Sequence, residues 1–149
     1  MVPQIDLLKR LVLSKFPVTI IQTEDAEQVI DLFKQLGEYE KKGFFYWHPE
    51  VGIHLLKNPS EPIANTQSLS SALTCIEQSQ HFGHFLLRSE MCDAACQDGC
   101  VNTIQHILKT PQKSYRKVFI IGKQPNIPLH LKSKIIVIRL STQYSGQVT

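Results

Sequence analysis

The chain has 149 residues, enough for one domain with a hydrophobic core of its own. Hydrophobic residues make up 42% and charged residues 19%, a balance that excludes a disordered chain. No apolar run reaches the roughly 20 residues of a membrane-spanning helix, and charges interrupt the amino-terminal stretch where a secretory signal would be apolar. Four cysteines fit free thiols in a reducing compartment, so we expect a cytoplasmic protein without membrane association.

The formal net charge of +3 is unevenly distributed. All 13 acidic residues lie at or before Asp98, which gives residues 1–98 a net charge of −5, and residues 99–149 carry +8 with no acid. Such a basic third could bind an acidic partner, nucleic acid included. The alternative is a solvated surface that the acidic half partly neutralises. We favour the alternative because aromatic residues are not interleaved with the basic ones, as base stacking requires.

Helical and strand-like patterns alternate from the start of the chain. Residues 5–16 have apolar side chains at helical spacing, and Pro17 ends the predicted helix. The β-branched run VTIIQT (18–23) predicts a strand buried on both faces. Residues 23–42 open with Thr23, carry acids in the first turn and have an amphipathic stripe, which predicts a helix.

The middle of the chain continues this alternation. GFFYWHP (43–49) predicts a second strand, and VGIHLLK (51–57) predicts a hairpin partner or an edge strand. Residues 58–67 have the composition of a loop. Ser68 is the expected amino-terminal cap of a helix over residues 69–80.

The last segments predict three further strands and one helix, which lies between the first two of them. HFLLRS (84–89) predicts a buried strand, and the later part of residues 93–110 predicts a helix. KVFIIG (117–122) and IIVIRL (135–140) predict the final strands. The remaining residues, 141–149, are expected to form a polar tail.

This order of segments predicts an α/β fold with three layers. We expect a doubly wound, mostly parallel five-stranded sheet with helices on both faces, forming a single domain over residues 1–140. In this architecture functional residues lie at the carboxyl ends of the strands. The candidate contact residues for a partner are therefore Thr23, Glu24, His48, Arg88, Glu90 and Lys123.

The strand ends lack a phosphate-binding loop, which needs glycines that leave backbone N–H groups open to an anion. The turn QTEDAEQ after the first strand has three acids and no glycine. The segment around IIGKQP contains a Gly-Lys pair, as a P-loop does, but differs from a P-loop at three positions. Lys117 occupies the place of the first P-loop glycine, and Gln124 replaces the magnesium-binding hydroxyl residue. Pro125 prevents direct entry into a helix. We therefore expect no nucleotide cofactor.

The strand HFGHFLLRSE raises the question of magnesium binding, because such a strand in a nucleotide hydrolase ends in acidic residues. Here Arg88 stands where a carboxylate is expected, and a cation there disfavours a second one. We interpret Arg88 as the partner of a neighbouring acid and Glu90 as the start of a loop.

Other chemistry has weak support in the sequence. Cys92, Cys96 and Cys100 recur every four residues. All three thiolates with His106, or two of them with His81 and His84, could supply four zinc ligands. The spacing matches no common zinc pattern, so we favour unreactive cysteines. No nucleophile elbow occurs, and His48 beside Glu50 is the best single candidate for a base. We predict no enzyme, no cofactor and no bound metal.

The segment order resembles a known family, the amino-terminal domain of the AAA+ ATPases typified by a conserved chloroplast reading frame. Thr23 and Glu24 fit the family's polar strand end, and Ile127 with Pro128 fits its turn. The similar stretches, between about Ile5 and Leu140, are IDLLKRLVLSKFPVTIIQTEDAEQVIDLFKQL, FFYWHPEVGIHLL, SLSSALTCIEQSQHFGHFLLRSE, VNTIQHILKT and KVFIIGKQPNIPLHLKSKIIVIRL.

The resemblance implies a RecA-like fold that has lost its phosphate loop and acts beside an ATPase module. The chain departs from the family in three places: no ATPase module follows Leu140, Arg88 and Ser89 replace a basic residue followed by an acid, and MCDAACQDGC has no counterpart. The leading hypothesis is a non-catalytic module that binds a partner protein or itself. The alternatives are a nucleic-acid-associated protein that uses the basic third and a zinc or thiol protein that uses the cysteines.

Overall fold

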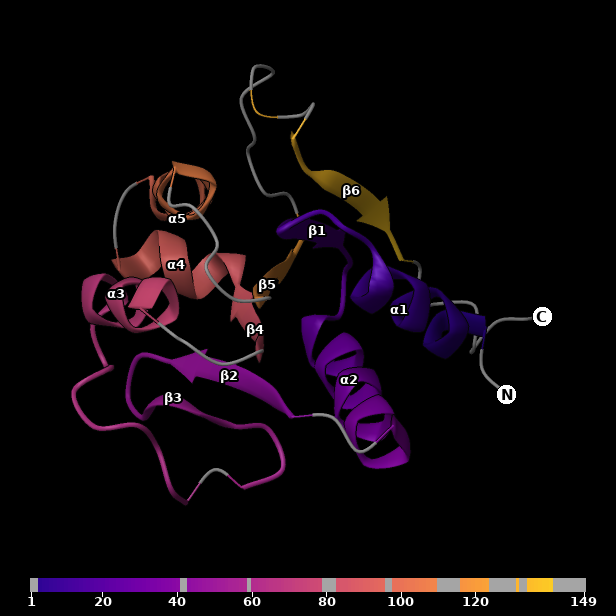
Figure 1. The fold of residues 1–149 in the computed structure, drawn as a ribbon, viewed down its shortest axis with the longest axis horizontal. Coiled ribbons are helices and arrows are strands. Elements are labelled where there is room, and N and C mark those ends of the chain that lie inside the picture. The colour runs from indigo at the N-terminus through magenta and orange to yellow at the C-terminus, as the bar shows by residue number, and fades with distance from the viewer. Residues whose placement is uncertain are drawn as a thin grey trace.

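The computed structural model describes residues 3–40, 43–58, 60–78, 83–95, 98–109, 116–123, 131 and 134–140 (Figure 1). Helices and strands alternate for most of this length. The helices are α1 Pro3–Leu13, α2 Ala26–Glu40, α3 Leu69–Gln78, α4 Ser89–Ala95 and α5 Gly99–Lys109. The strands are β1 Val18–Gln22, β2 Phe44–His48, β3 Gly52–Leu55, β4 Gly83–Arg88, β5 Arg116–Gly122 and β6 Ile136–Arg139. The predicted tail, residues 141–149, lies outside the described residues.

The described strands form one sheet in the order β3-β2-β4-β5-β1-β6. All neighbours pair in parallel except β2 and β3, which form an antiparallel hairpin. The predicted mostly parallel α/β fold is confirmed, but the sheet has six strands where we expected five. The sixth strand is Gly52–Leu55, which pairs antiparallel with β2 at the edge of the sheet and so confirms the hairpin partner predicted within residues 51–57.

Helices cover both faces of the sheet and give the three expected layers. Figure 1 shows α1 and α2 on one side and α3, α4 and α5 on the other. Each side has its own hydrophobic cluster, and alternate residues of one strand divide between them. On β1, Ile20 packs toward α3–α5, whereas Ile21 packs toward α1 and α2. No helix in the described ranges has the length and apolar character needed to cross a membrane.

The helix boundaries differ from the sequence prediction in two places. α2 begins at Ala26, three residues after Thr23, because Asp25 caps it. The segment after β4 forms two helices, since α4 starts directly at Ser89 and places Glu90 in its first turn. The interpretation of Glu90 as the start of a loop was therefore wrong. At Ser68 the predicted cap is confirmed, because its Oγ accepts the Ser71 N–H at 3.1 Å.

The α4–α5 junction depends on a glycine. Gly99 lies against the backbone of Cys92, and a Cβ at position 99 would lie 2.0 Å from the Cys92 carbonyl oxygen. The Cys100 N–H donates to Asp93 Oδ1 at 3.3 Å, and Thr103 Oγ1 donates to the Gly99 carbonyl at 2.6 Å. The packing of Gly99 on Cys92 and the hydrogen bond from Cys100 to Asp93 hold the two short helices together over the sheet, whereas the Thr103 hydrogen bond lies within α5.

β3 is the strand at one edge of the sheet, and the segment before α3 covers it. Thr66 Oγ1 accepts the Ile53 N–H at 2.8 Å and donates to the Ile63 carbonyl at 2.7 Å. The Ile63 N–H donates to the Ile53 carbonyl at 2.7 Å, and the indole N–H of buried Trp47 donates to the Thr66 carbonyl at 2.9 Å. The edge strand thus has partners for its backbone groups, which protects it from pairing with another chain.

Lys117 is a cation in the core. Its side chain lies on the same face of β5 as Phe119 and is 1% exposed. The ammonium group donates to the carbonyls of Ser14 and Phe16, just beyond the end of α1, and to Ser14 Oγ. Cations at a helix carboxyl terminus are favourable. Even so, burial lowers the pKa of Lys117 from 10.5 to about 8.

This low pKa predicts how stability changes with pH. Between pH 8 and 10.5 the unfolded chain holds the Lys117 proton and the folded chain does not, so folding becomes more favourable as the pH rises. Relative to Lys117→Met, which cannot titrate, the wild type should gain roughly 3 kcal/mol of unfolding free energy over this range. Chemical denaturation at several pH values measures the difference.

The matched control is Lys34→Met, because Lys34 is exposed on α2. Its unfolding free energy should run parallel to that of the wild type over the same pH range. If the wild type and Lys117→Met also run parallel, Lys117 does not titrate with a lowered pKa.

Candidate functional site: the carboxyl edge of the sheet

Five parallel strands end at the same edge of the sheet. Between neighbouring strands, Gln22 is aligned with Gly122 and with Arg139, and Arg88 is aligned with Ile121. The six residues expected to contact a partner all lie at or directly after these strand ends: Thr23, Glu24, His48, Arg88, Glu90 and Lys123. Their place at one edge agrees with the sequence analysis, and their role in binding stays a prediction.

These residues differ in what they offer to a partner. Thr23 is 4% exposed and the Arg88 side chain 18%, so both are mainly structural. Glu24 and Lys123 are exposed, and the Glu90 side chain is 60% exposed. The available surface therefore carries two carboxylates and one ammonium group.

The turn between β1 and α2 hydrogen-bonds to itself and to β5. The Thr23 N–H donates to the Gly122 carbonyl at 2.9 Å, and the Asp25 N–H donates to Thr23 Oγ1 at 3.1 Å. Asp25 Oδ1 then accepts the Gln28 N–H at 3.1 Å as the cap of α2. In an anion-binding turn these N–H groups would point at a phosphate. Here the protein's own oxygens accept their hydrogen bonds.

At the end of β5, the protein's own side chains also fill the space that a phosphate would need. A Cβ built on Gly122 would lie 1.8 Å from Ser89 Oγ, so only a glycine lets β5 pass the start of α4 this closely. Ser89 itself is 6% exposed. The glycine of the Gly-Lys pair therefore allows α4 to pack against β5, and Lys123 follows it on the surface.

Arg88 ends β4 in a small polar cluster with Tyr46, Glu90 and Met91. Its guanidinium pairs with Glu90 at 2.9 Å, which confirms the expected partner acid. The Tyr46 hydroxyl approaches Met91 Sδ at 4.0 Å. Burial raises the pKa of Tyr46, while a hydrogen bond and the charge of Arg88 act in the opposite direction. The position where a magnesium-binding carboxylate was sought thus holds a cation with a carboxylate partner.

The candidate base has a local role. His48 ends β2, and its Nδ1 accepts the Glu50 N–H at 3.1 Å, so it stabilises the turn between β2 and β3. The imidazole is half-buried beside this turn, and its contact with Glu50 is to the backbone N–H.

The two described cysteines near α4 and α5 are core residues. Cys92 lies on α4 and Cys100 on α5, and both are buried in the cluster beneath α3–α5. Burial raises the pKa of each thiol to about 12, so both are protonated at neutral pH. Zinc binding needs thiolates, which this environment disfavours. Cys96 lies outside the described residues, as do His81, Gln124 and Pro125.

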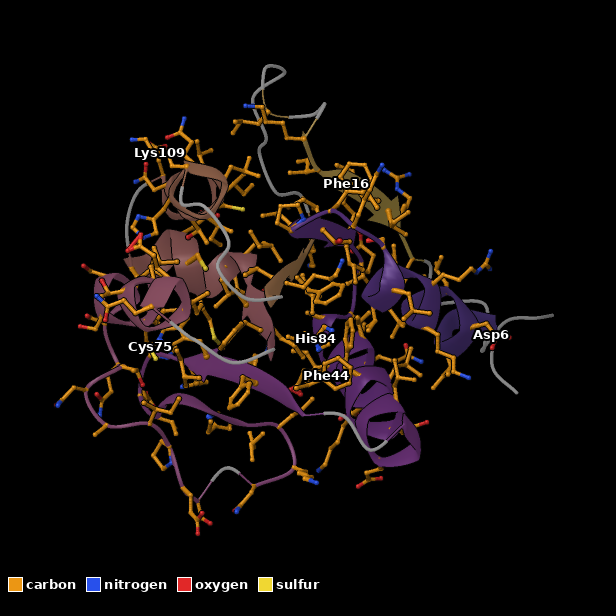
Figure 2. All side chains as sticks on the ribbon, in the orientation of Figure 1. Asp6, Phe16, Phe44, Cys75, His84 and Lys109 are labelled. Atoms are coloured by element: carbon orange, nitrogen blue, oxygen red, sulfur yellow. The ribbon has the colours of Figure 1, made fainter. Side chains whose placement is uncertain are left out.

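The histidines proposed as alternative ligands lie elsewhere. His106 faces α3, where Nε2 lies 2.9 Å from the Glu77 carboxylate. His84 is buried on the α2 side of β4, next to the ring of Phe44 (Figure 2). Within the described ranges no three His, Cys, Asp or Glu side chains are grouped as a metal site requires.

Two contributors to this edge were missed in the sequence. Asp25 was counted among the acids of the turn but not as the cap of α2, although an Asp directly before a helix is a known cap signal. Tyr46 was assigned only to a strand, and nothing local indicates that its hydroxyl reaches Arg88. Such a contact depends on the parallel pairing of β2 with β4.

The fold and this edge define a RecA-like α/β domain whose phosphate-binding position is occupied by its own side chains and hydrogen bonds. The model of the SpoVK-like AAA ATPase N-terminal domain matches residues 4–140. The chain therefore belongs to this family of AAA ATPase amino-terminal domains. A comparison with curated proteins found no match.

The Arg88 cluster makes a prediction about Tyr46. Replacing Arg88 by Met removes both the hydrogen bond and the positive charge that lower the pKa of Tyr46, so this pKa should rise above its wild-type value. NMR titration of protein labelled at the tyrosine ring carbon measures it. Arg139→Met, on the exposed end of β6, is the control and should leave it unchanged. An unchanged value in Arg88→Met would exclude the contact.

Proposed function

We propose that the protein is a non-catalytic interaction or regulatory module built on a RecA-like domain. The observation that carries this proposal is the self-satisfied turn between β1 and α2. Thr23 and Asp25 accept the N–H groups that a nucleotide phosphate would need. Family membership agrees with it, because the matched family is an amino-terminal domain of AAA ATPases.

Charge at this edge supports the proposal. Glu24, Asp25 and Glu27 surround the start of α2 and repel a phosphate. Across the edge, the Arg88 guanidinium disfavours the magnesium ion that would accompany a nucleotide. Neither half of a metal–nucleotide complex is favoured, so we infer that the edge serves protein contact.

The proposed contact surface consists of the exposed charges Glu24, Glu90 and Lys123, with half-buried His48 beside them. Mixed charges on a surface give specificity and orientation more than affinity. A partner would present a lysine or arginine to the two glutamates and an acid to Lys123. Arg88 and Thr23 act as positioning residues, since they hold Glu90 and the turn in place.

Two finer assignments belong to the same proposal. We infer that the chain is of the chloroplast reading-frame group of AAA+ proteins, on the similarity of the sequence segments. We also infer a cytoplasmic location, on the free thiols Cys75, Cys92 and Cys100.

Charge reversal tests the contact surface. The double variant Glu24→Lys/Lys123→Glu keeps the net charge and reverses both signs at the edge. Tagged protein expressed in its native cell should retain a specific partner, and the variant should lose most of it, at least tenfold by quantitative mass spectrometry. These residues are exposed, so thermal unfolding should change little.

The matched control is Asp31→Lys/Lys34→Glu, which reverses the same two charges on the exposed side of α2. It should capture the partner as the wild type does. Equal loss in both double variants, or equal retention in both, would contradict a partner site at the carboxyl edge.

A further inference from the structure

A second surface lies away from the carboxyl edge, between α5 and the segment that leads into β6. Gln105, Leu108 and Lys109 of α5 line a hollow of about 350 Å³ together with Leu131 and Lys134. We name this hollow the α5 groove. Lys109 ends α5 at its outer side (Figure 2), close in sequence to the start of β5, so the groove belongs to the half of the sheet opposite the strand ends described above.

The groove combines an apolar floor with cationic walls. Leu131 is 6% exposed and packs in the core cluster, and Leu108 is partly buried against the same cluster. Lys109 and Lys134 are exposed. Neither ammonium group pairs with a carboxylate in the part of the chain that the structure describes. Such a hollow suits an apolar side chain with negative charges beside it.

Directly after Lys134 in the sequence, β6 forms an incompletely covered strip of the sheet. In β6, Val137 is in register with Ile20, so its side chain points to the face that α3–α5 cover. Val137 is nevertheless 40% exposed, and Arg139, two residues on, is exposed on the same face. The helices on this side therefore leave β6 uncovered. β6 is also the strand at this edge of the sheet, and no described strand pairs with the backbone groups on its outer side.

The charge of the groove indicates the class of ligand. Residues 99–149 contain eight Lys and Arg and no acid, so the segments that line the groove carry only positive charge. An edge strand binds extended peptides by strand addition. Lysines beside an apolar hollow add a preference for Asp or Glu next to an apolar side chain.

We propose that the α5 groove and the edge of β6 bind an extended acidic peptide of a partner protein. Its apolar side chain enters the hollow between Leu108 and Leu131, and its flanking carboxylates pair with Lys109 and Lys134. The surface deepens the proposed interaction function and is separate from the carboxyl edge. Nucleic acid fits it less well, because the described lining has an apolar floor and no aromatic ring on which a base would stack.

A display library of twelve-residue peptides tests the proposal without knowledge of the natural partner. Selection on the full chain should enrich sequences with Asp or Glu beside Leu, Ile, Phe or Met. Fluorescence anisotropy of the selected peptides should show binding at least tenfold weaker for Lys109→Glu/Lys134→Glu. Binding should also weaken several-fold as salt rises from 50 to 300 mM.

Two double variants serve as controls. Lys34→Glu/Lys57→Glu makes the same charge change on exposed positions outside this face and should bind the peptides like the wild type. Glu24→Lys/Lys123→Glu should also bind them, which separates this surface from the carboxyl edge. Circular dichroism and thermal unfolding verify that each variant is folded.

Three results would overturn the proposal. The first is enrichment of sequences without acids, and the second is equal binding to wild type and Lys109→Glu/Lys134→Glu. The third is displacement of the peptides by a single-stranded twelve-nucleotide DNA at 150 mM salt, which would assign the surface to nucleic acid. Loss of partner capture only in Glu24→Lys/Lys123→Glu would leave the carboxyl-edge proposal standing by itself.

Discussion

The hydrogen bonds that close the turn between β1 and α2 determine what the carboxyl edge of the sheet can bind. β1 lies between β5 and β6, in the half of the sheet where a RecA-like domain would hold a phosphate after its first strand. In this chain Thr23 ties that turn to Gly122, and Asp25 supplies the carboxylate that caps α2. An external anion would have to displace the Asp25 carboxylate from the start of α2. The negative charges of Glu24 and Glu27 would oppose its approach.

Positions that serve nucleotide chemistry in a P-loop protein have structural roles here. Gly122 makes room for Ser89, and Arg88 pairs with Glu90 above β4. Lys117, which the sequence aligned with the first P-loop glycine, lies buried at the start of β5 and binds the chain beyond α1. The contacts of Gly122 with Ser89 and of Lys117 with Ser14 and Phe16 join elements that are distant in sequence. At these positions the protein's own residues pack against one another, which agrees with the proposed role in protein contact.

Much of this architecture follows from sequence periodicity. Apolar β-branched runs identified the parallel strands, and the absence of glycine after VTIIQ excluded a phosphate loop. Features that depend on contacts across the sheet could not be predicted. The sequence does not show that Lys117 is buried, because its burial depends on the position of β5 beneath the end of α1. Likewise, Tyr46 contacts Arg88 only because β2 pairs with β4. The division of residues 89–109 into two helices depends on Gly99, whose contact with Cys92 has no local sequence signal.

The backbone amides of Thr23, Asp25 and Gln28 report most directly on whether the turn is open to anions. In the account given by the structure, their NMR signals stay in place when millimolar magnesium–ATP is added to isotope-labelled protein, because Thr23 Oγ1, Asp25 Oδ1 and the Gly122 carbonyl already accept their hydrogen bonds. Saturable shifts at these three amides, larger than those at amides of α3, would show that a phosphate enters the turn and would contradict the account.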